Sequence, residues 1–149
     1  MSDNKPSFRQ PSVIEQIFNR AWGFLVGLGL GFSYNYLLQV RGRKTGKLYS
    51  TPIDVLEIDG RRFLVAPRGR TQWVRNAEAS GEVILKKGSS RQTFGLRLLA
   101  EEEKLPILKA YLDRFKAEVQ RYFPIQAGSP PDAFQQVARD YPGFELIHK

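Results

Sequence analysis

Hydrophobic residues follow a helical spacing near the N-terminus of the 149-residue chain. Over residues 11–26 apolar side chains recur every three or four positions, behind Pro11 and Ser12, two residues of the kind that begin helices. This pattern predicts an amphipathic helix over residues 11–26. Glycines at positions 27, 29 and 31 predict its end.

From residue 34 onward the pattern changes to short apolar runs bounded by turn residues, which is typical of strands. We expect strands over residues 34–41, 48–58, 61–66, 82–87, 91–100 and 144–147. Residues 42–47 predict a tight turn, and Asp59-Gly60 is a strong hairpin signal. Pro52 indicates a sheet edge, a bulge or a strand start, because proline has no N–H to donate to a neighbouring strand.

Helical signals return between and after these strands. Thr71 is predicted to cap a short helix that runs to about Ser80 and closes at Gly81. Pro106 suits the first turn of a longer helix, and a short helix is expected near residues 132–139. The longer helix carries an apolar stripe formed by Leu108, Tyr111, Leu112, Phe115, Val119, Tyr122 and Phe123.

The order of these elements predicts the fold class. Strands and helices do not alternate regularly, which argues against a doubly wound parallel sheet. We therefore expect an α+β, mainly β fold, with an antiparallel Greek-key-like sheet or small barrel and flanking helices. At this length, residues 1–149 are expected to form a single domain.

The uncharged segment over residues 21–38 has three interpretations. It is rich in large apolar side chains and almost long enough to span a bilayer, but four glycines interrupt it. It forms a buried element or a lid within residues 1–33, a peripheral membrane contact, or, least favoured, a membrane span. The first residues are polar and resemble no secretory signal, so we expect a cytoplasmic protein, in contact with the membrane surface if the second interpretation holds.

The composition excludes several kinds of chemistry. The chain has no cysteine and one histidine, His148. Disulfides and thiolate metal sites are therefore excluded, and a serine hydrolase triad or a multi-histidine metal site is not expected. No metal site is predicted. Any reaction is expected to depend on a bound cofactor or on Tyr, Lys and Arg side chains.

The positive charge is concentrated in one part of the chain. Residues 41–97 hold 13 Lys and Arg against 5 Asp and Glu, so they carry the whole net charge of +8, and the other 92 residues sum to zero. An even spread would indicate only solubility, whereas this concentration indicates an anionic partner.

Two compact motifs lie in this basic stretch. The turn Gly42-Arg43-Lys44-Thr45-Gly46 combines close backbone approach with cationic and hydroxyl donors, which suits a phosphate. It lacks the spacing of a Walker P-loop. The competing interpretation is a solvated basic hairpin turn.

The second motif runs from Pro67 to Asn76. Thr71 begins a helix whose free N–H groups suit a phosphate, and Trp73 and Asn76 share one helix face, which suits a heteroaromatic ring. The alternative is a core tryptophan beside a capping threonine. Tyr111, Tyr122 and Phe123 are interpreted as core, with a proton donor as the minority interpretation; these residues define no catalytic group.

Taken in order, these motifs resemble the deazaflavin-dependent nitroreductase family. The resemblance rests on Gly42-Arg43-Lys44-Thr45-Gly46 with Pro52, the Asp59-Gly60 hairpin, Val65-Ala66-Pro67-Arg68-Gly69, and Trp73 with Asn76, and it covers roughly residues 34–100. It implies a split β-barrel oxidoreductase that uses the reduced deazaflavin coenzyme F-420 to pass hydride to a quinone, a nitroaromatic or a similar hydrophobic acceptor.

The resemblance also implies a set of coenzyme-binding residues. Arg43, Lys44 and Thr45 would hold the phosphate. The residues lining the coenzyme groove would be Pro52, Ala66, Pro67, Arg68, Gly69, Trp73 and Asn76. The family often has an arginine where Tyr49 stands, and a leucine where Ala77 stands.

Two other functions stay open at this point. A related split-barrel group binds flavin mononucleotide (FMN), whose phosphate suits the same basic pocket. A basic nucleic-acid-binding barrel without catalysis is the other alternative, since the sequence pI is about 9.9. No specific nucleic-acid partner is expected, because no helix-turn-helix, zinc or RNP-type pattern is present. The sequence does not indicate an oligomeric state.

Overall fold

A computed structural model of the chain describes residues 33–149. The helix expected over residues 11–26 and nearly all of the proposed 1–33 lid lie outside the described residues. Within residues 33–149, no helix is long and apolar enough to cross a membrane. The fold begins with strands, as the pattern from residue 34 predicts.

Seven strands form one antiparallel sheet. They are β1 (Asn35–Arg41), β2 (Leu48–Asp54), β3 (Leu56–Ile58), β4 (Arg61–Val65), β5 (Glu82–Lys87), β6 (Ser90–Leu98) and β7 (Gly143–His148). Their order in the sheet is β2-β1-β5-β6-β7-β4-β3. The two edge strands, β2 and β3, are thus joined by a single residue, Val55. The sheet must curl until its edges meet, which produces a half-barrel.

This curl explains one wrong boundary. Residues 48–58 were expected as one strand, but the chain leaves the β1 ladder after Asp54 and enters the β4 ladder at Leu56. Val55 turns between them, and its N–H donates to the Tyr34 carbonyl at 2.9 Å. Pro52 lies in the edge strand β2, where its missing N–H costs no ladder bond.

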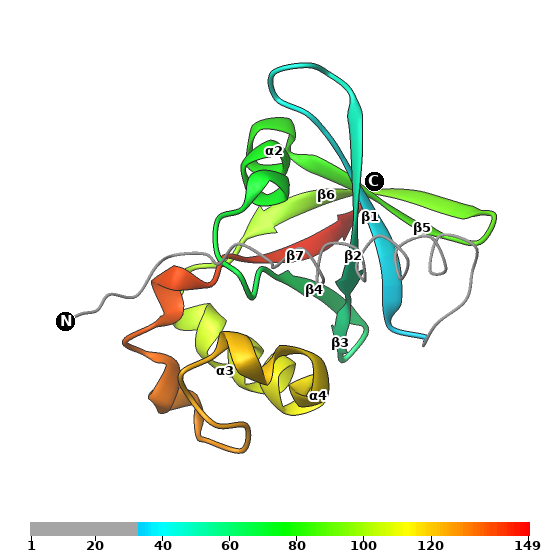
Figure 1. Cartoon of the computed structure of the whole chain (residues 1–149). Coiled ribbons are helices and arrows are strands. Elements are labelled where there is room, and N and C mark those ends of the chain that lie inside the picture. The colour runs from blue at the N-terminus through cyan, green and yellow to red at the C-terminus, as the bar shows by residue number, and fades with distance from the viewer. Residues whose placement is uncertain (1–32) are drawn as a thin grey trace.

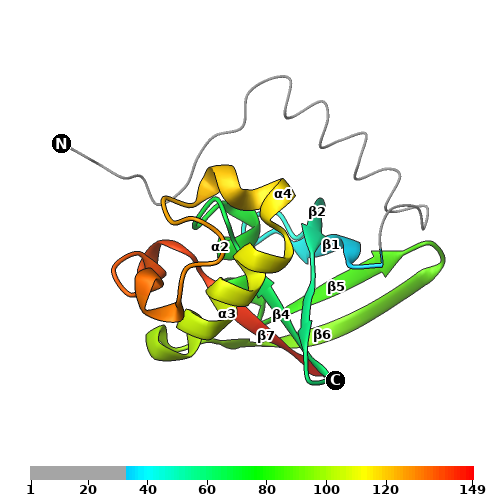
Figure 2. The same cartoon turned by 90° about the horizontal axis from the view of Figure 1, so that it is seen from below.

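The helices pack at opposite ends of the sheet. Figure 1 shows α2 (Gln72–Ser80) beside the β1–β2 hairpin, with α3 (Glu101–Arg114) and α4 (Lys116–Val119) at the other end. Seen from below, α3 and α4 lie in front of the sheet (Figure 2). Three short 3-10 turns complete the described fold: Gln120–Tyr122, Pro131–Phe134 and Ala138–Asp140.

Two helix predictions were wrong in detail. Pro106 is not in the first turn of its helix, because α3 begins five residues earlier at Glu101, where the Glu103 carboxylate accepts the Ala100 N–H at 2.9 Å. The helix expected at residues 132–139 is two separate 3-10 turns, because the three residues 135–137 between them form a turn.

Two apolar clusters hold the fold together. One fills the interior of the curled sheet, with Leu38, Val40, Leu64, Val83 and Phe94 among its members. The second packs the apolar stripe of α3 and α4 against β3 and β4, and it includes Leu108, Tyr111, Leu112 and Phe115. This explains why the stripe residues 108–123 stay on one side although the helix breaks at Phe115.

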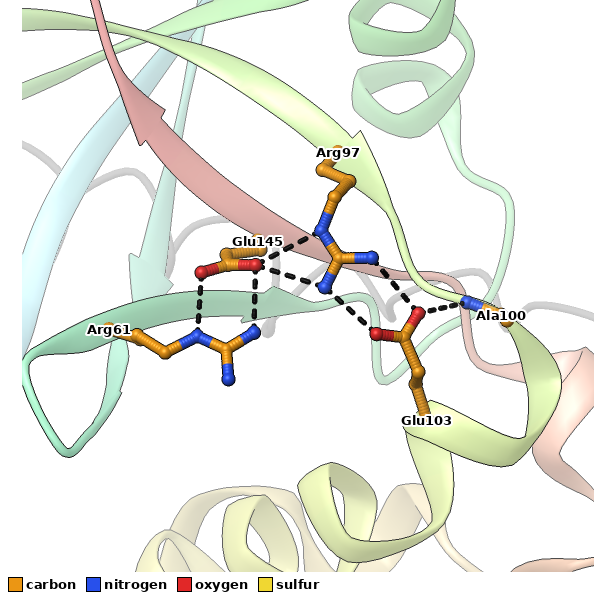
Figure 3. Close-up of polar contacts among 5 residues, drawn as sticks. All are labelled: Arg61, Arg97, Ala100, Glu103 and Glu145. Carbon is orange, nitrogen blue, oxygen red and sulfur yellow. Dashed lines mark hydrogen bonds and ion pairs between the residues drawn. The ribbon is translucent and has the colours of Figure 1, made fainter.

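An ion-pair network ties three strands to α3 on the outside of the sheet (Figure 3). The Glu145 carboxylate of β7 accepts hydrogen bonds from Arg61 of β4 at 2.8 and 3.0 Å and from Arg97 of β6 at 3.0 and 3.1 Å. Arg97 also donates to Glu103 of α3 at 2.9 and 3.0 Å. These bonds, those from Arg61 most of all, lower the pKa of Glu145 to about 2.

Candidate functional site

A basic pocket lies between the β1–β2 turn and α2. Its volume is about 620 Å³. Four of its lining residues are arginines and one is a lysine: Arg43, Arg68, Arg70, Arg75 and Lys44. The turn and the helix start, which the sequence predicted as two phosphate motifs, therefore meet at one cavity.

The turn has a fixed backbone. The Gly42 N–H donates to the Lys47 carbonyl at 2.7 Å, and the Gly46 N–H donates to the Gly42 carbonyl at 2.9 Å. Gly46 has a φ of +76°, which favours glycine. The Tyr49 ring packs so closely on Gly42 that a Cβ at Gly42 would lie 2.6 Å from the ring. Tyr49 thus covers the turn, in place of the arginine that the family often carries.

Asn76 connects this turn to α2. Its side chain is buried, and its Oδ1 accepts both the backbone N–H of Arg43 at 3.1 Å and the Arg43 guanidinium at 2.7 Å. Gln72 also accepts from the Arg43 guanidinium, at 3.0 Å. Asn76 therefore positions Arg43 and the turn.

Two buried donors in the same pocket lack an acceptor. The Nη1 of Arg68 and the Oγ1 of Thr71 are buried and make no hydrogen bond within residues 33–149. Thr71 occupies the N-cap position of α2, as predicted, but its hydroxyl makes no capping bond. A buried donor without a partner costs free energy, so both atoms fit an anionic ligand seated at the helix start.

A second pocket, of about 820 Å³, continues the first. Thr51, Arg68 and Trp73 line both. The second pocket is bounded by β2 on one side and by α3, α4 and the following 3-10 turn on the other. Its walls include apolar groups from Pro52, Ile53, Val65, Pro67 and Val119. The two pockets form one groove, with a cationic end and an end lined by both apolar and charged groups.

Two carboxyl groups meet in the wall of the second pocket. Asp54, at the end of β2, and Glu118 of α4 both line this pocket. Burial, followed by the bond to Glu118 and the Glu118 charge, raises the pKa of Asp54 to about 8. Tyr34 donates to the Glu118 carboxylate at 3.0 Å, and Asn35 donates to Asp54 at 2.6 Å.

The structure distributes the predicted site residues over this groove. Arg43, Lys44, Thr45 and Asn76 line the basic pocket, Pro52 and Pro67 line the second, and Arg68 and Trp73 line both. Ala66 and Gly69 are not among the described residues of either wall. They are buried, and the Gly69 N–H donates to the Ala66 carbonyl at 3.1 Å, which shapes the loop that carries Arg68.

Sequence reasoning missed the carboxyl pair. Asp54 and Glu118 lie 64 positions apart and belong to no shared motif. The one available signal was an aspartate at the end of an otherwise uncharged strand. No local pattern marks Glu118, which lies in a helix with charged neighbours.

Solved structures support the fold. An F420-H2 dependent reductase (FDR-A) is similar at 21% identity with a TM-score of 0.52, over 76% of this chain and 94% of that chain. A domain-swapped dimer matches at 21% identity and a TM-score of 0.54, over 89% and 92%. The haem storage protein HutZ of Vibrio cholerae matches at 11% identity and a TM-score of 0.53, over 78% and 82%. These likenesses confirm the split-barrel fold.

The sequence itself gives a more specific match. No curated protein sequence matches the chain. The model of the F420H(2)-dependent quinone reductase family matches residues 15–128, which is most of the chain. This confirms the resemblance found in the motifs. The chain therefore belongs to the F420H(2)-dependent quinone reductase family, and it is an oxidoreductase of the deazaflavin-dependent kind.

Proposed function

We propose that this protein passes hydride from the reduced deazaflavin coenzyme F-420 to a quinone, a nitroaromatic or a similar hydrophobic acceptor. The observation that carries the proposal is the pair of buried donors, Arg68 Nη1 and Thr71 Oγ1, which lack an acceptor in a cationic pocket at a helix start. A phosphate ester would satisfy both donors and would interact favourably with the partial positive charge of the helix.

The groove suggests how the coenzyme would be held. Arg43, Lys44 and Thr45 would bind the phosphate together with Arg68. The remaining predicted residues would line or shape the path of the ring system, namely Pro52, Ala66, Pro67, Gly69, Trp73 and Asn76. Trp73 supplies an aromatic face between the two pockets, and Asn76 acts mainly by fixing Arg43.

The bound coenzyme would supply the hydride, and the protein supplies binding, orientation and exclusion of water. The second pocket is the proposed acceptor site, because it adjoins the basic pocket and has apolar walls. A planar quinone or nitroaromatic fits such a pocket, with its polar oxygens toward Tyr111, Asp54 and Glu118.

Titration with each cofactor tests the proposal. Purified protein should quench or shift the fluorescence of coenzyme F-420 with saturable binding, and FMN should bind at least about tenfold more weakly. Replacing both Arg43 and Lys44 with Ala should weaken coenzyme binding at least about tenfold, since a desolvated hydrogen bond to a charged group contributes about 1.5–3 kcal/mol.

The result has clear alternatives. Tighter binding of FMN than of the deazaflavin would favour the flavin-binding split barrel instead. Unchanged affinity in the folded double variant would show that the phosphate lies elsewhere. An Arg91→Met variant is the matched control, because Arg91 is exposed on β6 and lines neither pocket among the described residues.

A further inference from the structure

The carboxyl groups of Asp54 and Glu118 both line the second pocket. On the outer side of the pair, Asn35 donates to Oδ1 of Asp54 at 2.6 Å and Tyr34 donates to Oε2 of Glu118 at 3.0 Å. Burial and the neighbouring Glu118 raise the pKa of Asp54 to about 8, so near neutral pH Asp54 keeps a proton that its carboxyl can donate. Two adjacent carboxylates in a partly buried site do not both ionise easily.

The same wall carries a phenol, which can donate a hydrogen bond to a ligand oxygen. Tyr111 is 2% exposed and lines the second pocket. Its ring contacts Phe115 and Phe123. Burial, followed by the charges of Asp54 and Glu118, raises its pKa, so the phenol stays neutral and keeps its proton to donate.

Reduction of a quinone needs a proton as well as a hydride. The hydride brings two electrons to the acceptor, and the oxygen that gains negative charge must be protonated to give the hydroquinone. General acids that supply such a proton act best when their pKa lies near the working pH. The pair lies in the proposed acceptor pocket.

We propose that the Asp54–Glu118 pair is the proton donor for the acceptor, while the Tyr111 hydroxyl holds an acceptor oxygen by a hydrogen bond. This inference rests on the proposed function. The carbon–hydrogen bond of the reduced coenzyme breaks, and its electron pair moves with the hydride to the acceptor. The carboxyl O–H bond of Asp54 breaks as a new O–H bond forms on the acceptor. The coenzyme is oxidised and the acceptor reduced.

The proton balance then closes. After the transfer, Asp54 and Glu118 both carry a negative charge, and the repulsion between neighbouring like charges favours the return of a proton. The oxidised coenzyme releases one ring proton to solvent, so the net reaction consumes no proton. Glu118 is exposed and connects the pair to water, from which the proton is regained.

The groups around the pair come from every element packed against it. Tyr34 precedes β1, and its pKa is raised to about 12 by burial and by its bond to Glu118. The Arg114 guanidinium of α3 lies 5.4 Å from the Tyr34 ring centre. On the pocket side, Tyr111, Lys116, Arg121 and Tyr122 share the wall.

The first test is the pH dependence of turnover with a quinone under saturating coenzyme. In the wild type, kcat/KM for the quinone should fall as the pH rises through about 8, because the pair then loses its proton. Asp54→Asn should abolish this alkaline limb and lower kcat about 100-fold, the usual scale of a general acid. Glu118→Gln should move the limb to lower pH, since the charge and the hydrogen bond of Glu118 both raise the Asp54 pKa.

Controls separate this role from a structural one. Coenzyme affinity should stay within about twofold of the wild type in both variants, because neither residue lines the basic pocket. Glu57→Gln is the matched control, because it replaces an exposed carboxyl on β3 with an amide and should leave the pH profile unchanged. Asp54→Glu keeps an acid and should restore part of the rate.

A second measurement needs no coenzyme. Carbon-13 NMR of the free protein should show an aspartate carboxyl that titrates near pH 8, and this signal should be absent in Asp54→Asn and shifted to lower pH in Glu118→Gln. If the wild type is active but Asp54→Asn and Glu118→Gln keep its rate and its loss of kcat/KM at alkaline pH, the proton-donor role is overturned and the proposed function is not. A wild type that neither binds nor oxidises the reduced coenzyme would overturn the proposed function, and the proton-donor role with it.

Discussion

At the residue scale, Arg68 is the side chain whose position is best explained by the proposed ligand. Its Nη1 is buried without an acceptor in the described part of the chain, so it costs stability in the free protein. Residues held at such a cost are commonly found at functional sites.

A substitution that removes the unpaired donor of Arg68 should therefore affect stability and coenzyme binding in opposite directions. Arg68→Met keeps most of the side-chain volume and removes the unpaired donor, so the free energy of unfolding should stay the same or rise by up to about 1 kcal/mol. Coenzyme affinity should fall about 10- to 100-fold. Thermal unfolding and fluorescence titration measure the two. A variant that loses stability without losing affinity would make Arg68 a structural residue.

Asn76 illustrates how far sequence reasoning reaches at this scale. Its place on the same helix face as Trp73 was predictable from their spacing of three, and both line the basic pocket. Its bond to Arg43 was not, because that contact joins positions 33 residues apart. The sequence predicted the residues of the phosphate motifs, but only the fold shows that one residue of the second motif orients the first.

Asn76→Ala should therefore act on both motifs. It removes an acceptor shared by two donors of Arg43, so it should lower the free energy of unfolding by about 1–2 kcal/mol and weaken coenzyme binding by about tenfold. Asn76→Asp keeps the acceptor oxygen and should restore most of both. Chemical denaturation and fluorescence titration of the two variants provide the comparison. Equal effects of Ala and Asp would show that the bond to Arg43 is not what matters.

At the element scale, the bounds of the strands were more predictable than the way in which the sheet curls into a half-barrel. Strands β1, β5, β6 and the β3–β4 hairpin lie close to their predicted bounds because alternation and Asp59-Gly60 are local signals. The break at Val55 was not predictable, because a curl that brings β2 and β3 to opposite edges is set by the pairing of distant strands. The early start of α3 at Glu101 reflects three glutamates that favour a helix N-terminus, which outweighed the Pro106 signal.

The Glu145 network predicts how these elements respond to acid. The folded pKa of Glu145 is lowered from 4.5 to about 2, so its bonds to Arg61 and Arg97 contribute stability that is present above about pH 4.5 and is lost as the pH falls toward 2. Glu145→Gln should lower the free energy of unfolding by about 1–2 kcal/mol at pH 7. The difference from the wild type should shrink at pH 2–3 in denaturant titrations. A difference that stays constant down to pH 2 would contradict the charge-based explanation.

At the scale of the whole molecule, the structure shows where the positive charge of residues 41–97 lies. The +8 carried by residues 41–97 belongs to strands β1 to β6 with α2, and its two glycine-rich turns converge on one pocket. The acidic groups lie at the other end of the groove, in Asp54 and Glu118. In the proposed function, the split barrel presents a cationic site for an anionic coenzyme beside a pocket lined by apolar and acidic groups.

The central claim is that this groove carries out deazaflavin-dependent reduction, and anaerobic turnover tests it most directly. Protein mixed with reduced coenzyme F-420 and a soluble quinone should restore the visible absorbance of the oxidised coenzyme. The rate should saturate in both substrates, and Arg68→Met should raise the coenzyme KM at least about tenfold. A wild-type protein that leaves the reduced coenzyme unoxidised while it turns over a flavin would contradict the account.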